Sequence, residues 1–178
     1  ALEKASGREL TSWAQEWLQT SGVNTFAPDF EVGADGTFTR FAVAQSAAPE
    51  FPTIRRHRIG IGVYDLVDGT LSRRTAVEID VQGDSTEVPE LVGVAQPDLL
   101  LLNAGDLTYA KIRLDERSLA TAVASIDKVE DSLARALLWG ATWDMTRDAE
   151  MTATDFVELV LRGIGTETDT TAVGRLPG

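Results

Sequence analysis

The chain has 178 residues, of which 43% are hydrophobic, and this is enough for one ordinary core or two small ones that share an interface. Its formal net charge of −12 disfavours attraction to phosphate backbones, which rests on clustered Lys and Arg, so we expect no nucleic acid partner. The sequence contains no cysteine, which excludes a disulfide framework and a thiolate zinc site. No stretch approaches the ~20 consecutive apolar residues of a membrane span, so we expect no membrane partner.

The two ends of the chain predict a piece cut from a longer protein. The N-terminus begins at Ala1 without an initiator Met and without the apolar region of a signal peptide. The C-terminus at Gly178 follows soon after a helical pattern. Together with the absence of cysteine, these features are compatible with the cytoplasm, and we expect a cytoplasmic protein.

A helix is predicted for the first zone, residues 1–22. Ser6, with Glu9 three positions later, has the spacing of a capping box. Apolar side chains then recur at helical intervals, at Leu10, Trp13, Ala14, Trp17 and Leu18. Gly22 is placed to end the helix. A lone amphipathic helix of this length needs a partner surface.

The second zone, residues 23–114, alternates with the period of two that is typical of strands. Short strands separated by turn signals predict an antiparallel β-sandwich. In the strand near its start, we expect Phe41 and Val43 on one face, and Phe38 and Ala42 on the other.

Later strands of this zone carry more specific signals. Asp68-Gly69 predicts a hairpin, because a type I′ turn needs positive φ at both central residues. The apolar run Leu99–Leu102 predicts a fully buried strand. Two further alternating stretches are predicted to be strands, with apolar residues at Val77, Ile79 and Val81 and at Ala110, Ile112 and Leu114.

At Leu114-Asp115 the period changes from two to about 3.6, which predicts helices over residues 115–178. Cap spacing is found at Asp127 with Glu130 and at Thr152 with Asp155. One helical face is formed by Phe156, Leu159, Val160, Gly163 and Ile164. A preceding helix, with Leu133, Leu137, Trp139 and Trp143, covers too wide an arc for a single face, so we expect the side with the tryptophans to need a further partner.

The single histidine, His57, lies within Arg55-Arg56-His57-Arg58. A metal ligand or general base there would lie among three cations, which disfavour both a bound cation and a protonated imidazole. We therefore interpret His57 as part of a polar strand edge that faces solvent or a neighbouring domain. The arginines lack the interleaved aromatic residues of a nucleic-acid patch, and the sequence has no G-x-S-x-G elbow.

Other patterns resemble chemical signatures without completing them. Gly60-Ile61-Gly62 begins like a dinucleotide fingerprint, but the third glycine is missing and a hairpin follows, which favours a strand whose glycines permit close packing. A pair of catalytic carboxylates has no local signature, and most acids here fall at caps, turns or strand exteriors. The four tryptophans, at Trp13 and Trp17 and at Trp139 and Trp143, are interpreted as packing residues.

Several segments resemble the aminopeptidase N family of zinc peptidases in its bacterial members. The N-terminal pattern Leu10-x-x-Trp13-x-x-x-Trp17-Leu18 is similar to the end of their catalytic domain. Five further segments are similar to their sandwich domain: residues 56–65, Val88-Pro89-Glu90-Leu91, Pro97-Asp98-Leu99, and residues 101–103 and 106–111. The start of their helical C-terminal domain is resembled by residues 113–119, 139–141 and 143–148.

This resemblance implies a piece of a peptidase that removes N-terminal residues from peptides with one zinc ion. Residues 1–22 would close the catalytic domain, 23–114 would form the sandwich domain, and 115–178 would begin the helical C-terminal domain. The family's H-E-x-x-H helix and G-x-M-E-N strand are absent from this sequence. The resemblance therefore gives no catalytic, cofactor-binding or metal-binding residue to any position here, and it implies zinc in the parent enzyme.

Three hypotheses follow for the function. The first is a non-catalytic scaffold, in which the sandwich spaces a catalytic domain from a helical cap, with the missing domains of the same polypeptide as partners. A fragment with a bare helical face would then self-associate. The second is a free-standing sandwich that binds peptide or carbohydrate, but the strand aromatics are few and scattered. The third is a hydrolase with two catalytic carboxylates.

Overall fold

The computed structural model describes residues 3–4, 7, 9–165 and 167. Helix α2 (Thr11–Leu18) precedes a block of strands, and further helices follow the strands. The strands are β1 (Asn24–Val32), β2 (Phe38–Ala47), β3 (His57–Val67), β4 (Thr70–Val81), β5 (Ser85–Glu87), β6 (Leu99–Leu102) and β7 (Lys111–Ile112). The helices after them are α3 (Glu116–Ser125), α4 (Ser132–Arg147) and α5 (Ala153–Gly163), with 3-10 turns η1 (Pro89–Leu91) and η2 (Ile126–Lys128). This order confirms the predicted fold class.

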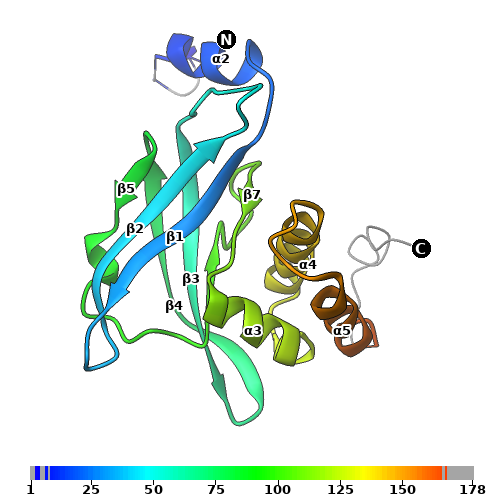
Figure 1. Cartoon of the computed structure of the whole chain (residues 1–178). Coiled ribbons are helices and arrows are strands. Elements are labelled where there is room, and N and C mark those ends of the chain that lie inside the picture. Colours follow the sequence, from blue (N-terminus) through cyan, green and yellow to red (C-terminus); the bar gives the residue numbers. More distant parts are fainter. Residues whose placement is uncertain (1–2, 5–6, 8, 166, 168–178) are drawn as a thin grey trace.

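The described strands form two sheets, in the orders β5-β2-β1-β7 and β4-β3-β6. Their pairs are antiparallel except for β1 with β7, which run parallel. The β3–β4 hairpin turns at Asp68 (φ 50°) and Gly69 (φ 81°), which are the positive φ values that the predicted type I′ turn requires. Figure 1 shows this hairpin extending beyond the sandwich, with α3, α4 and α5 gathered on one side of it.

The first core fills the space between the two sheets. Phe26, Phe41 and Val43 of one sheet are fully buried there with Ile61 and Val63 of the other. Burial of such side chains stabilises the fold by roughly 1.5–3 kcal/mol each. Phe41 and Val43 thus share the inward face of β2, as the alternation in the sequence predicted.

The predicted face of Phe38 was wrong, because this side chain lies in the same core as Phe41. The β1–β2 register shifts between Glu31 and Val32, where Arg40 pairs with Glu31 and Phe38 pairs with Val32. The residue between them, Thr39, is therefore extra, and a bulge of one residue turns the following side chains to the opposite face.

The second core lies between the other face of sheet β4-β3-β6 and the helices. Tyr64, Leu99 and Leu101 pack there with Leu138 and Leu159. Leu100 and Leu102 point the opposite way, into the first core. Strand β6 is thus buried on both faces, as its unbroken apolar run predicted, and the molecule has three layers in which the middle sheet is covered on both sides.

The N-terminal helix is shorter than the predicted 1–22. Within the described residues α2 covers only Thr11–Leu18, and the predicted cap Ser6 lies outside these residues. Gly22 does not end the helix but lies in the connection to β1 with φ 92°, where a Cβ atom would approach the Cβ of Phe51 to 2.4 Å. The helix ends early because the carbonyl of Glu16 accepts hydrogen bonds from Arg55 Nε and from the Thr20 hydroxyl, which fix the chain just after it.

The caps of the later helices confirm one prediction and correct another. The Thr152 side chain accepts from Asp155 N at 3.1 Å, as the spacing predicted. Asp127, by contrast, lies in η2, and α4 is capped by Asp131. The start of α4 is displaced because Glu130 N donates to the carbonyl of Leu71, which fixes the preceding segment to β4.

Candidate functional site at the joint between α2 and the sandwich

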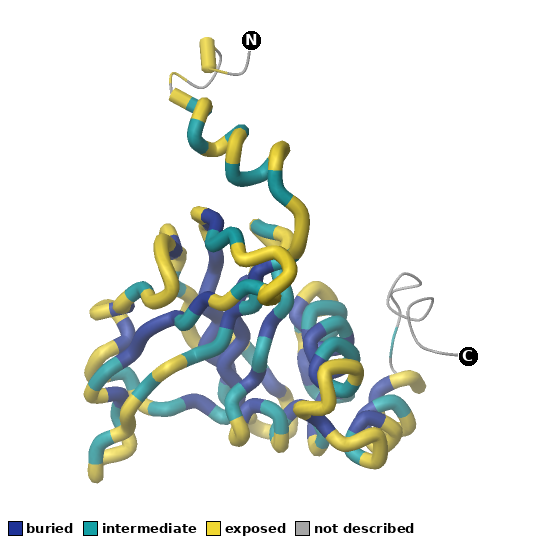
Figure 2. The backbone as a smooth tube through the Cα atoms, turned by 45° about the horizontal axis from the view of Figure 1, so that its top comes forward, coloured by how far each residue is buried: buried dark blue, intermediate teal, exposed yellow. Residues whose placement is uncertain are grey.

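Helix α2 stands out from the body of the molecule. None of its residues is buried, and Figure 2 shows it as exposed and half-buried above the dark core of the sandwich. It is held by a polar cluster at the end of the sandwich, formed by Trp17, Asn24, Arg55, His57 and Thr108, which we call the α2 joint. The cluster joins α2 to the starts of β1 and β3 and to the loop before β7.

Arg55 is the central donor of the α2 joint and is only 3% exposed. Its Nε donates to the carbonyl of Glu16 at 2.9 Å, and Nη2 donates to the Thr20 hydroxyl at 2.7 Å and the Ser21 carbonyl at 2.9 Å. The guanidinium carbon also lies 5.4 Å from the centroid of the Trp17 ring. The last carbonyls of a helix lack partners within the helix, so a buried arginine can satisfy them.

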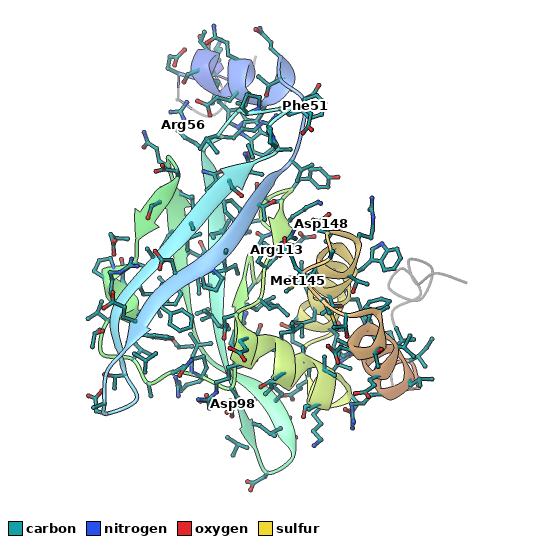
Figure 3. All side chains as sticks on the ribbon, in the orientation of Figure 1. Phe51, Arg56, Asp98, Arg113, Met145 and Asp148 are labelled. Atoms are coloured by element: carbon teal, nitrogen blue, oxygen red, sulfur yellow. The ribbon has the colours of Figure 1, made fainter. Side chains whose placement is uncertain are left out.

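The neighbouring arginines are also engaged within the chain. Arg56 pairs with Glu16 at 3.1 Å, and its carbonyl accepts from the Trp17 indole at 3.3 Å. Arg58 pairs with Glu78 and Asp80, each at 3.0 Å. These contacts use the cations that a phosphate patch would need. Figure 3 shows Arg56 and Phe51 in the region beneath α2.

The predicted solvent-facing position of His57 was wrong, because its side chain is buried with 6% exposure. Its Nδ1 lies 2.8 Å from the Thr108 hydroxyl, and its Nε2 lies 3.1 Å from Asn24 Oδ1. The edges of the Trp17 and Phe26 rings meet the imidazole at centroid distances of 5.0 and 4.9 Å. His57 therefore packs against Trp17 of α2 within this chain, and whether α2 belongs to a neighbouring domain stays a prediction.

The bonds of Asn24 fix the protonation of His57. Asn24 Nδ2 donates to the Thr53 carbonyl at 2.7 Å, so its Oδ1 is the atom that faces Arg55 and His57. Because an amide oxygen only accepts, Nε2 of His57 carries the hydrogen and Nδ1 accepts from the Thr108 hydroxyl. Burial, and then the nearby Arg55 cation, lower the pKa of His57 to about 4, so the ring is neutral at pH 7.

This arrangement is unsuited to base catalysis or metal binding, since both ring nitrogens are already engaged. The partners of His57 were missed from the sequence. Asn24 and Thr108 lie 33 and 51 positions away, and neither forms a local motif with the histidine. The pairing of strand ends that brings them together is a tertiary feature.

Gly60 and Gly62 face the loop that follows β6. A Cβ at Gly60 would lie 2.8 Å from the carbonyl oxygen of Ala104, and one at Gly62 would lie 2.9 Å from the Ala104 Cβ. Ala104 N also donates to the Gly60 carbonyl at 2.9 Å. The glycines therefore allow a close approach of backbone, which confirms the packing interpretation over the dinucleotide fingerprint.

Two acidic side chains, Asp98 and Asp148, form hydrogen bonds and ion pairs that link separate elements. Asp98 accepts from Leu66 N and from Arg117, and these bonds, the first most strongly, lower the pKa of its carboxyl. Asp148 accepts from Lys111 and Arg113, which likewise lower its pKa, and Figure 3 shows Arg113 and Asp148 close together between β7 and α4. Carboxylates held in the charged form by cations are poorly suited to act as general acids.

Hollows border α2 in the part of the chain that the structure describes. A cleft of about 460 Å³ separates it from the ends of β3 and β4, and its lining includes Trp13, Arg56, His57, Arg58 and Asp80. A groove of about 560 Å³ lies along α2 itself, and its apolar lining consists of Leu10, Trp13, Ala14 and Leu18. The cleft is polar with its arginines already paired, whereas the groove follows the apolar face of α2, which no described helix or strand covers.

The C-terminal tryptophans are packing residues, as predicted. Trp139 is 4% exposed, and its indole donates to Glu167 Oε2 at 2.9 Å. Trp143 lies against the ring of Phe156 at a centroid distance of 5.4 Å. The side with these tryptophans was predicted to need a further partner, and for Trp139 this partner is α5, since Trp139 packs closely on Gly163.

The uncovered side of the helical layer lies elsewhere. Leu133, Val157, Leu161 and Ile164 are 42%, 53%, 74% and 43% exposed. Sequence periodicity placed Ile164 on the packed stripe, but this residue follows the end of α5 and turns outward. Among the described residues, no helix is long and apolar enough to cross a membrane, and no group of three or more His, Cys, Asp or Glu could hold a metal ion.

Comparison with known proteins connects this architecture to a family. The model of the ERAP1-like C-terminal domain family matches residues 99–176, beginning at the first residue of β6. The chain is 51% identical over 176 residues to an Aminopeptidase N of Streptomyces lividans, covering 95% of this chain and 20% of that relative. It thus spans about a fifth of the relative's length. These matches support the interpretation of the chain as a fragment of an aminopeptidase N family protein.

Proposed function

We propose that this chain is a non-catalytic scaffold segment of a zinc-dependent aminopeptidase, in which the sandwich spaces a catalytic domain from a helical cap. The observation that carries the proposal is the 51% identity to a fifth of an Aminopeptidase N. The third hypothesis, a two-carboxylate hydrolase, is not supported, because Asp98 and Asp148 are held in ion pairs. A free-standing binding module is not favoured by the comparisons.

The residues that the structure describes do not fit a catalytic zinc ion. Such a site needs several convergent histidines or carboxylates, and the described residues contain no such group. The single histidine is buried beside Arg55 with both ring nitrogens engaged. We therefore assign the zinc chemistry of the parent enzyme to another part of it, and no catalytic step to this chain.

The proposed partners are the catalytic and helical domains of the same polypeptide. The apolar groove along α2 is suited to pack against the catalytic domain, because Trp13 and Leu18 are 39% and 73% exposed. The outward face with Val157 and Leu161 is suited to pack against further helices. Uncovered apolar patches of this kind mark interaction surfaces. We place the whole protein in the cytoplasm, and we expect neither nucleic acid nor a membrane as a partner.

Two measurements test this proposal. The genomic reading frame around the segment that encodes Ala1 should contain an H-E-x-x-H motif upstream, and a frame without one would contradict the parentage. The chain itself, washed with a chelator and analysed for metals, should hold no stoichiometric zinc and should not cleave an aminoacyl reporter. One tightly held zinc per chain together with turnover of the reporter would overturn the scaffold role.

A further inference from the structure

The α2 joint accommodates one protonation state of His57. In the neutral ring, Nε2–H donates to Asn24 and Nδ1 accepts from the Thr108 hydroxyl. A second proton, on Nδ1, would point at the hydroxyl oxygen, and Thr108 would have to turn its own hydrogen away into a half-buried site. In the neutral state both ring nitrogens are bonded. Protonation of Nδ1 therefore leaves the Thr108 hydroxyl hydrogen without its acceptor.

The groups that face His57 oppose a positive charge. Arg55, from the segment before β3, shares the Asn24 oxygen with it and repels an imidazolium. On the side of α2, Glu16 favours the imidazolium, but its carboxylate already pairs with Arg56. The remaining neighbours that pack on the ring are the uncharged Trp17 and Phe26, with Asn24 and Thr108. The charged side chains Glu9, Arg58 and Asp80 line the adjoining cleft.

We propose that the α2 joint is an acid-sensitive hinge, in which protonation of His57 releases α2 from the sandwich while the sandwich stays folded. The helix is suited to release because none of its residues is buried and its attachment is mainly polar. The sandwich is suited to survive it, because its core between the sheets contains no residue of α2. The hinge is built from contacts within this chain and does not depend on the proposed function.

The sign and size of the effect follow from proton linkage. In the docked state, burial and the Arg55 cation lower the pKa of His57 to about 4. Part of this burial comes from Trp17 of α2, whose ring meets the imidazole at 5.0 Å, and Arg55 is held in place by the Glu16 carbonyl of α2. Release of α2 weakens both effects, so the undocked state binds a proton more readily. Docking is therefore most favourable above pH 6.5 and weakens as the pH falls towards 4. Between pH 7.5 and pH 5, the ratio of undocked to docked α2 should rise, with an upper limit of roughly 30-fold set by the full shift of the pKa from 6.5 to about 4.

Nuclear magnetic resonance of the whole chain across pH 7.5 to 4 tests the hinge. Because the sequence has a single histidine, its imidazole signals belong to His57 without ambiguity. We expect the α2 amides and the Trp17 indole, which donates to Arg56, to change together with these imidazole signals. The amides of Gly60 and Ile61 in β3 should keep their positions and their protection from exchange over the same range.

The control is His57→Gln, whose amide donates to Asn24 and does not titrate. This variant should keep α2 docked without a transition in this range, and an unchanged transition would overturn the proposal. So would titration of His57 with no response of α2, or loss of β3 signals together with those of α2. If His57→Gln does not fold, Thr108→Val replaces it. Removing the donor to the neutral ring should move the transition to higher pH, and an unmoved midpoint would equally overturn the hinge.

Discussion

The two helical parts of this molecule attach to the sandwich by different physics. Helix α2 contributes no buried residue and is held by directional bonds from Arg55, Arg56 and the Trp17 indole. The layer of α3, α4 and α5 attaches through an apolar core, with Leu138 and Leu159 fully buried against the middle sheet. Hydrogen bonds orient their partners with a modest net contribution, whereas apolar burial supplies most of the stability.

This difference shows which helices form one folded unit with the sandwich. Helix α2 is held mainly by directional polar bonds, and a groove follows its apolar face. It is therefore suited to pack against another domain. The helical layer is instead integral, because its core includes side chains of β3 and β6 such as Tyr64 and Leu99. Mutations at the two attachments should therefore have distinct consequences.

The largest effect is expected in the helical layer. Leu138→Ala removes a fully buried side chain from the second core and should lower the free energy of unfolding by about 2–5 kcal/mol, because it leaves a cavity. Urea denaturation followed by circular dichroism measures this. Leu161→Ala, at a side chain that is 74% exposed, is the control and should change stability by less than about 0.5 kcal/mol. Similar losses in both variants would mean that the helices are not integral.

A smaller effect on stability, confined to one element, is expected at the α2 joint. Arg55→Met removes donors to Glu16, Thr20 and Ser21 and should release α2, at about 2 kcal/mol, because the freed carbonyls regain water. Hydrogen exchange should show lost protection in α2 and unchanged protection in β3. Arg58→Met, which breaks exposed ion pairs, should leave α2 protected. Equal protection of α2 in both variants would show that Arg55 does not hold the helix.

A third prediction concerns the loop that approaches β3. Gly60→Ala places a Cβ 2.8 Å from a backbone oxygen of Ala104, so the loop must shift, and stability should fall by about 1–3 kcal/mol. Gly140→Ala is the matched change, because within α4 nothing lies within 4 Å of its Cβ position. That variant should gain about 0.5–1 kcal/mol from helix propensity. Thermal denaturation of both proteins measures the opposite signs, and a stable Gly60→Ala would contradict the close approach.

The sequence predicted local features better than contacts between distant segments. The type I′ turn at Asp68-Gly69 and the cap at Thr152 depend on neighbouring residues, and both were found as predicted. The bulge that reverses Phe38 has no sequence signal, because Thr39 fits a regular strand as well as a bulge. The division into domains at residues 22 and 114 stays a prediction.

The site shows the same limit more strongly. The run from Arg55 to Arg58 looks like a solvated polar edge, because four polar residues in a row usually face water. Two of them, Arg55 and His57, are instead buried by α2, β1 and the loop before β7. Their burial depends on partners that are supplied by distant segments, Asn24 among them. Composition and spacing within the run contain no information about those partners.

The smallest change in folding stability is expected for a variant that alters self-association of the chain. The face with Val157, Leu161 and Ile164 is exposed, and we expect the isolated chain to self-associate through it. Leu161→Glu should abolish this association and leave the unfolding free energy within about 0.5 kcal/mol, because the side chain is already exposed. Sedimentation over a range of concentrations measures the association.

Leu18→Glu, on the groove of α2, separates the two surfaces, since it should leave association through α5 intact. A wild-type chain that is monomeric at all concentrations would show that this face needs no cover, and association lost only in Leu18→Glu would move the interface to the groove of α2.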